Sequence, residues 1–593
     1  MNWRIKIFSK LKKAFSSVCL TEKQSAYLFF FGLIIFCGNF LFARLFAVYD
    51  DDFMYLPAFS WTWEEAWAQV YQDFITWPQG RPLAYGLGHL LFFLTAKTQS
   101  LGLSYLTGFL LLLLNAILLN RLVRPFLSNV ASLLAVTVFI LYPADTSKII
   151  LMMRVFAQLN LTFLLVALLM YVRGWRWQSY LVAALCFMTY EPTFLPFLLA
   201  PLLVSTFREV SWRRVLQHVL ICGCIVMLLL VFRSHLGDPR LCKTIDSPLE
   251  AISRICQALW IGPRVALMAL LLRPLEALIR TDPILWVVVL LCSGAFYLLS
   301  RYLEKKEGED HQAWPVPSLP WIATVGAVGL LLGYALCFTD DYWPPIMTIG
   351  RISGYHATGA VGASLLVGAL FGLALEKLPR LRPCLIVGAA AFCGLLVSFG
   401  IEVQRIDYIK HADQQSRFWR TVLETSAEWK PDTVILVDIS GNDPSRPFTP
   451  GMPLWWTVNF APLILEHLVD WPAEWEMITP ASSPRALKYP RAYGFLDSME
   501  TVWEGDVLTI KTPAWLGSPW WPRIRDGQFI LFRFVGGRMV RVSEPIKLGG
   551  RYIMPMGRAG EDGVSLSQSR VFRLLFEKET NWRTIQKAKN YPR

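Results

Sequence analysis

Long apolar runs separated by short charged segments fill the chain up to about residue 400. The first run, 24–43, has no charged residue, and a helix of about 20 apolar residues spans a bilayer. Similar runs recur at 98–120, 125–144, 155–172, 177–190, 192–207, 215–232, 283–300, 312–339, 352–375 and 383–401. The pattern predicts an α-helical polytopic membrane protein with about 11 transmembrane helices, or up to about 13 if 82–96 and 256–279 also cross. The short run 82–96 is more typical of an interfacial or re-entrant segment.

The pattern changes after residue 403. Charged residues and prolines are then spread throughout, and the short runs 433–439, 506–511 and 528–535 predict strands. Residues 405–429 predict a helix with Trp419 and Trp429 at its apolar positions. We therefore expect 404–593 to form a C-terminal α+β domain with its own core.

Basic residues set the expected orientation of the helices. They precede the first run and recur between later runs, for example at Arg121, Arg124, Arg173, Arg176, Arg301, Lys305, Lys306, Lys377, Arg380 and Arg382. The positive-inside rule holds such segments in the cytoplasm, so 1–25 is expected to be a cytoplasmic N-terminus and 26–403 the transmembrane domain. The first outer loop, 49–100, and the C-terminal domain are then extracytoplasmic. We expect a multi-pass protein of the inner (plasma) membrane.

Composition agrees with a membrane protein and excludes other classes. Of 593 residues 54% are hydrophobic, and the net charge of +13 is dispersed over short loops, which favours contact with membrane lipids and argues against nucleic-acid binding. All eleven cysteines lie at or before Cys393, so the C-terminal domain is not built on disulfides. Cys242 and Cys256 share the outer loop 234–282 and could pair. No CxxC or HExxH spacing predicts a zinc site.

Three consecutive acids, Asp50, Asp51 and Asp52, follow the first apolar run. Carboxylates are expensive inside lipid, so we expect these at the water boundary on the outer face. One interpretation is a helix end, where acids are favoured in the first turn. The other is a general base with a neighbour that holds a cation or orients an acceptor hydroxyl. Adjacent carboxylates could hold Mg²⁺ or Mn²⁺, although no full ligand set is visible.

The same outer loop continues with aromatic residues and an arginine. Trp61, Trp63, Trp67, Tyr71 and Trp77 predict an amphipathic interfacial helix, since aromatic side chains favour the headgroup level. Gly80-Arg81-Pro82-Leu83 follows. Arg81 either anchors the loop at the interface or binds a phosphate through paired hydrogen bonds.

Further polar residues lie at the outer ends of later runs. Glu191 interrupts an apolar stretch and is either part of a structural ion pair or lines a cavity, with Arg154 as its candidate partner. Arg351 opens a glycine-rich segment, with His356 close behind it. Arg351 is either a solvated loop end or, at a helix N-terminus, a ligand for a phosphate.

Two of these motifs resemble those of membrane glycosyltransferases. Asp51-Asp52-x-x-Tyr55, just after the first helix, resembles the Asp-Glu-x-x-Tyr pattern of the lipid A aminoarabinose transferases, which belong to the GT-C class. The stretch 80–83 resembles the Gly-Arg-Trp/Pro-Leu element of bacterial O-antigen glucosyltransferase-like proteins, which also carry an early acid pair. The chain departs from the first pattern in its second acid, which is Asp in place of Glu, and in the additional Asp50.

The resemblance implies a GT-C-like catalytic domain that moves a sugar from a polyprenyl-phosphate-linked donor to an extracytoplasmic acceptor. That acceptor would be an envelope glycan, such as lipopolysaccharide, or a protein. The family's catalytic carboxylate corresponds to Asp51, with Asp52 as its partner. The residues expected to bind substrate are Asp50, Arg81, Arg154, Glu191, Arg351 and His356. The alternatives from other classes are a secondary transporter or lipid flippase, and a non-catalytic scaffold.

Overall fold

The computed structural model describes the main part of the chain. Its described residues are 22–204, 211–236, 248–306, 318–338, 343–425, 429–430, 433–438, 491–495, 500–511, 523–535, 538–556 and 575. The expected cytoplasmic N-terminus up to residue 21 lies outside them, as does Cys242 of the expected cysteine pair. Cys256 is described and is an exposed free thiol.

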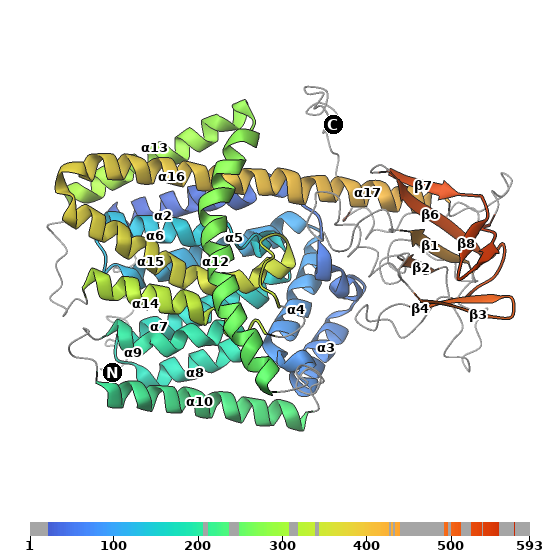
Figure 1. Cartoon of the computed structure of the whole chain (residues 1–593), viewed down its shortest axis with the longest axis horizontal. Coiled ribbons are helices and arrows are strands. Elements are labelled where there is room, and N and C mark those ends of the chain that lie inside the picture. Colours follow the sequence, from blue (N-terminus) through green and yellow to red (C-terminus); the bar gives the residue numbers. More distant parts are fainter. Residues whose placement is uncertain are drawn as a thin grey trace, which may run out of the picture.

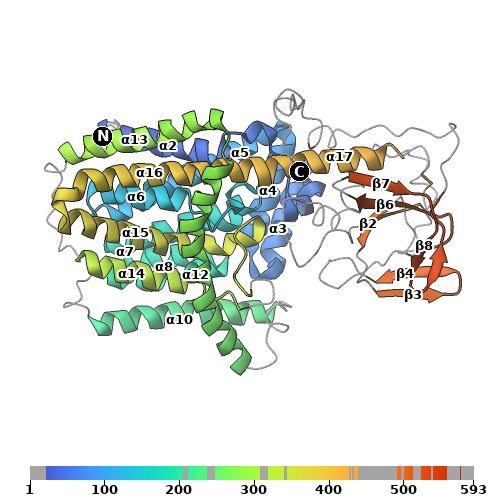
Figure 2. The ribbon, with the colours of Figure 1, turned by 45° about the horizontal axis from the view of Figure 1, so that its top comes forward.

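Helices form a bundle that is followed by strands (Figure 1). The α-helices are α2 (Glu22–Ile35), α3 (Trp63–Thr76), α4 (Pro82–Thr98), α5 (Leu101–Val123), α6 (Asn129–Ile140), α7 (Asn160–Val172), α8 (Arg176–Phe187), α9 (Ala200–Leu203), α10 (Trp212–His235), α12 (Pro248–Arg280), α13 (Trp286–Lys305), α14 (Leu319–Leu332), α15 (His356–Lys377), α16 (Arg382–Glu402) and α17 (Lys410–Leu423). α17 leads from the bundle toward the strands (Figures 1 and 2). α3 and α4 lie at the end of the bundle that faces the strands, which we call the strand-facing end.

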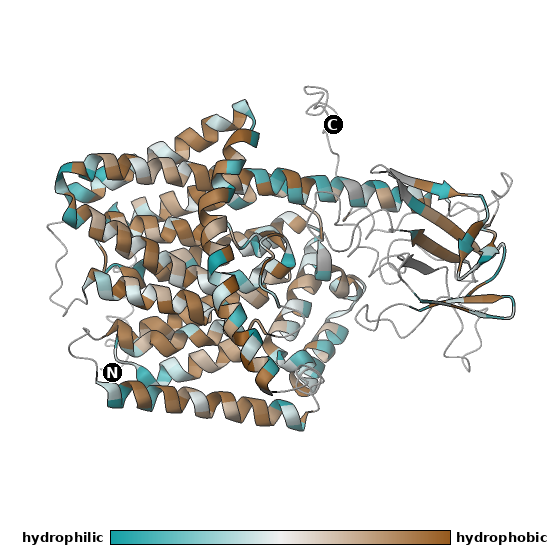
Figure 3. Cartoon of the chain, viewed as in Figure 1, coloured by the Kyte–Doolittle hydropathy of each residue, from teal (hydrophilic) through white to brown (hydrophobic). Residues whose placement is uncertain are grey.

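Eight helical stretches among the described residues are long and apolar enough to cross a membrane. They are Glu22–Leu45, Leu101–Val123, Arg154–Val172, Trp212–His235, Leu249–Arg280, Pro283–Lys305, Arg351–Lys377 and Pro379–Leu423. Figure 3 shows hydrophobic residues along most of their length. The last stretch ends in α17, which is largely hydrophilic. A largely helical architecture is therefore confirmed, and it is consistent with a polytopic membrane protein. The finer count of about 11 to 13 transmembrane helices and the GT-C fold stay predictions.

One of these eight stretches does not run alongside the others. α12 has the length and composition of a span, but in both views it runs across the neighbouring helices (Figures 1 and 2). It packs against α14, α15 and α16. The segment 256–279, which the sequence leaves as a possible extra crossing, belongs to this transverse helix.

Ion pairs join several helices at the end of the bundle opposite to the strands. Lys306 Nζ, just after α13, lies 2.9 Å from Glu22 Oε2 at the start of α2. Arg382 Nε, at the start of α16, lies 2.7 Å from Glu304 Oε1. These residues belong to basic segments that the positive-inside rule predicts to be cytoplasmic. The side of the membrane on which that end lies stays a prediction.

Regular helices give way to short turns at the strand-facing end. The 3₁₀ turns there are η2 (Ala43–Leu45), η3 (Asp50–Phe59), η4 (Pro78–Gly80), η5 (Ser147–Ile149), η7 (Glu191–Leu199) and η11 (Arg351–Tyr355); η9 (Pro283–Leu285) and η12 (Pro379–Leu381) precede α13 and α16. Three π-helical segments continue or begin long helices: η1 (Phe36–Phe40), η6 (Arg154–Leu159) and η13 (Val403–Ile409). Prolines within η3 and η7 favour the irregular turns. π-helical segments are frequent at functional sites.

α14 and α15 pack closely because glycines face each other between them. A Cβ at Gly326 would lie 2.5 Å from the backbone nitrogen of Leu366, and one at Gly362 would lie 2.1 Å from that of Leu330. Small residues allow two helix backbones to approach each other in a membrane. This packing fixes α15 and therefore the position of η11, which directly precedes it.

The C-terminal part contains a mixed sheet with the strand order β2-β1-β6-β7. β1 (Val434–Asp438) lies parallel to β2 (Arg491–Phe495) and to β6 (Phe529–Val535), and β7 (Arg538–Val542) is antiparallel to β6. β3 (Glu500–Glu504), β4 (Val507–Lys511) and β5 (Arg523–Ile524) form a second sheet, and β8 (Ile546–Leu548) pairs with β9 (Arg551–Ile553). The strands predicted at 433–439, 506–511 and 528–535 are confirmed.

The two faces of β1 bury different partners. Ile435 and Val437 belong to the large cluster that includes the bundle and Trp419 of α17, whereas Val434 and Leu436 pack with the second sheet. This alternation follows the two-residue period of a strand. The helix predicted over 405–429 ends at Leu423; it is continuous with α16 through η13 and buries Trp419, while Trp429 is buried beyond its end.

Candidate functional site

Asp52 is a buried anchor of the strand-facing end. Its side chain is 0% exposed, and its carboxylate accepts hydrogen bonds from the backbone N–H groups of Tyr49 (3.2 Å), Leu151 (3.2 Å) and Met152 (2.7 Å). Burial raises the pKa of Asp52 to about 7, although the three N–H groups act in the opposite direction. The contacts tie η3 to the segment before η6. This geometry suits a residue that positions its neighbour Asp51 better than one that reaches a substrate.

Asp51, the adjacent acid, points to a different partner. Its Oδ2 lies 3.1 Å from Nε of Arg351, and the two side chains are 19% and 21% exposed. The structure therefore brings together two of the residues that the sequence singled out. Asp50 begins η3, but its side chain lies outside the described part of the structure.

The backbone before Arg351 is held in a conformation that favours glycine. Gly350 has φ of 72° and ψ of −162°, a combination that L-residues with a Cβ avoid. Its N–H donates to Oγ1 of Thr146 at 2.9 Å, and the N–H of Thr146 donates to Oγ of Ser353 at 3.0 Å. The hydroxyl of Tyr408, in η13, donates to the carbonyl oxygen of Thr146. The joint between α16 and α17 is thus bonded to the segment that positions Arg351.

Glu191 binds two arginines. Its Oε2 accepts hydrogen bonds from Nε and Nη2 of Arg81 at 3.0 and 2.8 Å, and its Oε1 accepts one from Nη1 of Arg233 at 2.7 Å. The three side chains are only 12%, 6% and 5% exposed, respectively. Two guanidinium groups therefore share one carboxylate. We call Arg81, Glu191 and Arg233 the arginine cluster.

The expected partner of Glu191 was wrong, and one member of the cluster was missed. Arg154 lies elsewhere, because its Nε donates to the carbonyl of Leu151 at 2.9 Å and its Nη1 donates to the carbonyl of Ser104. Arg233 closes α10, and its Nη2 donates to the carbonyl of Gln79 at 3.2 Å. The signal that could have found it is a lone charge at the outer end of an apolar run.

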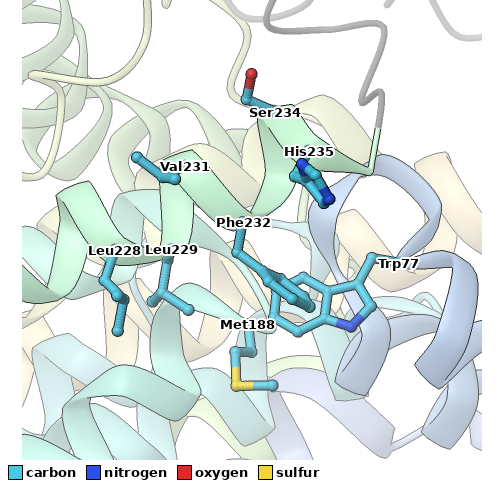
Figure 4. A pocket seen from close by; sticks show the side chains of 8 residues that line it. All are labelled: Trp77, Met188, Leu228, Leu229, Val231, Phe232, Ser234 and His235. Carbon is cyan, nitrogen blue, oxygen red and sulfur yellow. The ribbon is translucent and has the colours of Figure 1, made fainter.

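An apolar cavity of about 940 Å³ borders the arginine cluster. It is lined by Trp77, Met188, Leu228, Leu229, Val231, Phe232, Ser234 and His235 (Figure 4). Phe232 extends from α10 toward Trp77, with ring centroids 4.6 Å apart. Because Phe232 precedes Arg233 directly and Met188 lies three positions before Glu191, the charged cluster adjoins the cavity wall. A hydrocarbon chain with an anionic end matches this combination of surfaces.

The arginine cluster and the Asp51–Arg351 pair lie on neighbouring elements. η7 begins at Glu191 and bonds to α15 through the hydroxyls of Thr193 and Thr358, which are 3.3 Å apart. α4, which follows Arg81, packs against η3, which carries Asp51. Both charged groups therefore belong to the same strand-facing end.

The remaining expected binding residues are buried. Arg154 is 1% exposed and within electrostatic range of Asp52, and its Nη2 has no hydrogen-bond partner among the described residues. His356 is 0% exposed; its Nδ1 lies 2.6 Å from the hydroxyl of Tyr334. Because both side chains are buried, they are better placed to hold neighbouring elements of the site than to contact a ligand. Their role in binding substrate stays a prediction.

No metal site emerges from the described ranges, which contain no group of three or more His, Cys, Asp and Glu side chains arranged to hold an ion. Adjacent carboxylates could have held a cation together, but Asp51 and Asp52 have different partners. Asp52 accepts hydrogen bonds from backbone amides, and Asp51 pairs with Arg351.

Comparisons with known proteins add no family. No protein-family pattern matches the chain, and neither the curated proteins nor the solved structures give a match. The geometry at the strand-facing end is therefore what carries a functional hypothesis.

Proposed function

We propose that the protein is a membrane glycosyltransferase that moves a sugar from a polyprenyl-phosphate-linked donor to an extracytoplasmic envelope acceptor. The observation that carries the proposal is the arginine cluster beside an apolar cavity, with the carboxylate of Asp51 on a neighbouring element. A lipid-linked sugar phosphate needs each of these surfaces. The cavity takes the hydrocarbon chain and the guanidinium groups take the phosphate.

The reaction follows from the roles of these groups. Asp51 accepts the proton of an acceptor hydroxyl while that oxygen attacks the anomeric carbon. The bond between the anomeric carbon and the phosphate oxygen breaks, and its electron pair leaves with the lipid phosphate. Arg81 and Arg351 stabilise the charge that develops on the departing phosphate. A single displacement of this kind inverts the configuration of the sugar.

Two largely buried acids, Asp52 and Glu191, position the groups that react. Asp52 holds η3 through its three backbone hydrogen bonds and so positions Asp51. Glu191 holds Arg81 and Arg233 close together, because its carboxylate offsets the repulsion between the two guanidinium groups. The C-terminal domain, joined through α17, contributes to the choice of acceptor.

The test is transfer of radiolabelled sugar from a polyprenyl-phosphate donor to an envelope acceptor extract by purified protein in nanodiscs. We expect transfer by the natural sequence, loss of at least about a hundredfold in Asp51→Asn, and unchanged transfer in Glu64→Gln, which removes an exposed carboxylate of the same outer segment. Transfer that survives Asp51→Asn would rule out this base. Movement of the lipid across the bilayer without any transfer would favour a flippase.

A further inference from the structure

A pair formed by an aspartate and a histidine joins α3 to α4 at the strand-facing end. Nδ1 of His89 lies 2.7 Å from Oδ2 of Asp73, and Oδ1 of Asp73 accepts a hydrogen bond from Nε2 of Gln69 at 3.0 Å. The side chains of His89 and Asp73 are 13% and 5% exposed. Both oxygens of this buried carboxylate have a partner, so the carboxylate holds the imidazole ring in one orientation.

The contact with Asp73 determines which nitrogen of His89 is available to a ligand. An ionised carboxylate only accepts hydrogen bonds, so Nδ1 carries the proton and Nε2 of the neutral ring is an acceptor. In the described part of the chain no residue bonds to Nε2 of His89, and this atom is not enclosed by the fold. His89 therefore presents a hydrogen-bond acceptor of fixed direction at the molecular surface.

Aromatic rings flank this imidazole. The ring of Tyr55, in η3, lies edge-on to that of His89 with centroids 4.8 Å apart, and the ring of Trp61 lies 5.4 Å from it. Tyr55 is fully buried and stacks on Phe92 of α4 at 4.6 Å, whereas Trp61 is only partly buried. Trp61 therefore leaves part of its surface exposed near the acceptor nitrogen of His89.

We propose that Trp61 and His89 form the subsite for a sugar ring of the acceptor, with Asp73 as the positioning residue that orients His89. A sugar ring has an apolar C–H face, which packs against an aromatic side chain, and hydroxyl groups, which donate to an acceptor such as Nε2. This inference rests on the proposed function, because it assigns the ligand to the acceptor of the transfer. It gives that acceptor a chemical class, a glycan and not a protein side chain.

The position of His89 favours the acceptor over the donor as the source of that sugar. Arg81 caps α4, and His89 lies a little over two helical turns further, a rise of about 12 Å along the axis. The anomeric carbon of a donor is separated from its phosphorus by a single oxygen, so the acceptor ring, which approaches that carbon from the far side, lies further from Arg81. Tyr55 follows Asp51 in η3 and is within electrostatic range of both Asp51 and Asp73, which places the subsite beside the proposed base.

The first experiment compares two substitutions of His89 in the transfer assay, with an oligosaccharide fraction released from envelope glycans as acceptor. His89→Asn keeps an N–H donor for Asp73 but removes Nε2. It should raise the KM for the oligosaccharide about three- to tenfold, as expected for the loss of one hydrogen bond, with kcat and the donor KM changed less than about twofold. His89→Gln, whose amide oxygen can replace Nε2 as acceptor, should raise this KM less.

Double substitution separates a positioning role from a structural one. Asp73→Asn should raise the KM for the oligosaccharide but add nothing to the effect of His89→Asn, because it acts through the ring. Glu64→Gln, on the exposed surface of α3, should leave this KM unchanged. Equal effects of His89→Asn and His89→Gln, a fall in kcat alone, or a rise in the donor KM alone would each refute the subsite.

A second measurement uses the natural sequence. Diethyl pyrocarbonate should modify His89, and the oligosaccharide fraction should suppress this modification, detected by mass spectrometry, while that of the exposed His235 stays constant. The same oligosaccharides with every hydroxyl methylated should not protect. If His89 is not modified, or if only the polyprenyl-phosphate sugar protects it, the subsite is refuted. Transfer that depends on Asp51 without protection of His89 refutes the subsite alone, whereas protection without transfer supports a glycan site and refutes the proposed function.

Discussion

Replacing Glu191 by glutamine should destabilise the protein more than removing either arginine that it binds. The side chain accepts three hydrogen bonds of 2.7 to 3.0 Å from Arg81 and Arg233, which are 6% and 5% exposed. Glu191→Gln removes the carboxylate that two buried guanidinium groups share. Removing one partner of a buried ion pair costs about 3–5 kcal/mol.

A loss of stability of this size can be measured by thermal unfolding. The chain contains 24 tryptophans, so thermal unfolding in nanodiscs can be followed by intrinsic fluorescence. Because the shift in midpoint per kcal/mol falls with chain size, we expect Glu191→Gln to lower the midpoint by about 2–4 °C. Arg233→Gln should cost less, since Arg81 and Glu191 remain as a neutral pair. Combining it with Glu191→Gln should recover part of the loss.

The order of the unfolding midpoints of these variants tests the explanation. If Glu191→Gln unfolds at the midpoint of the natural sequence, the cluster does not hold η4, η7 and α10 together. If the double substitution is less stable than Glu191→Gln alone, repulsion between the arginines is not the cause of the loss. Inorganic phosphate should raise the midpoint of Glu191→Gln more than that of the natural sequence, because it replaces the missing negative charge.

Three further predictions concern other parts of the same end. Because the pKa of Asp52 is raised from 3.8 to about 7 in the folded protein, folding favours its protonated form; stability should fall by up to about 4 kcal/mol as pH rises from about 4 through about 7, and Asp52→Asn should flatten this dependence in thermal unfolding. Gly350→Ala forces a Cβ into a conformation reserved for glycine and should cost about 1–3 kcal/mol, measured by the same unfolding assay. Leu229→Trp, at a partly buried position of the cavity wall, fills the cavity and should weaken binding of polyprenyl phosphate at least about tenfold, whereas Leu216→Trp, at an exposed position of α10 outside the cavity, should not; equal binding by both variants would exclude the cavity as the chain site.

The sequence was sufficient for the elements whose signal is local. Apolar runs located the long helices, and short runs located β1, β4 and β6. Alternation explains why β1 buries both faces, although only the structure shows that one face joins the bundle. The direction of α12 was not predictable, because length and composition specify a helix that could span but not the angle at which it packs.

The site was only partly predictable, because its contacts are long-range. Asp51, Arg81, Glu191 and Arg351 were singled out as charges at boundaries, yet nothing in the sequence pairs Asp51 with Arg351. Three consecutive aspartates look alike along the chain, and only the local path of η3 buries Asp52 and leaves Asp51 partly exposed.

The central claim is that a lipid phosphate binds at the strand-facing end beside Asp51. The most direct test is a cryo-electron microscopy structure of the protein in nanodiscs with polyprenyl phosphate. The account predicts a phosphate in contact with Arg351 and the arginine cluster, and the hydrocarbon chain in the cavity beside α10. A lipid phosphate bound elsewhere would contradict the account.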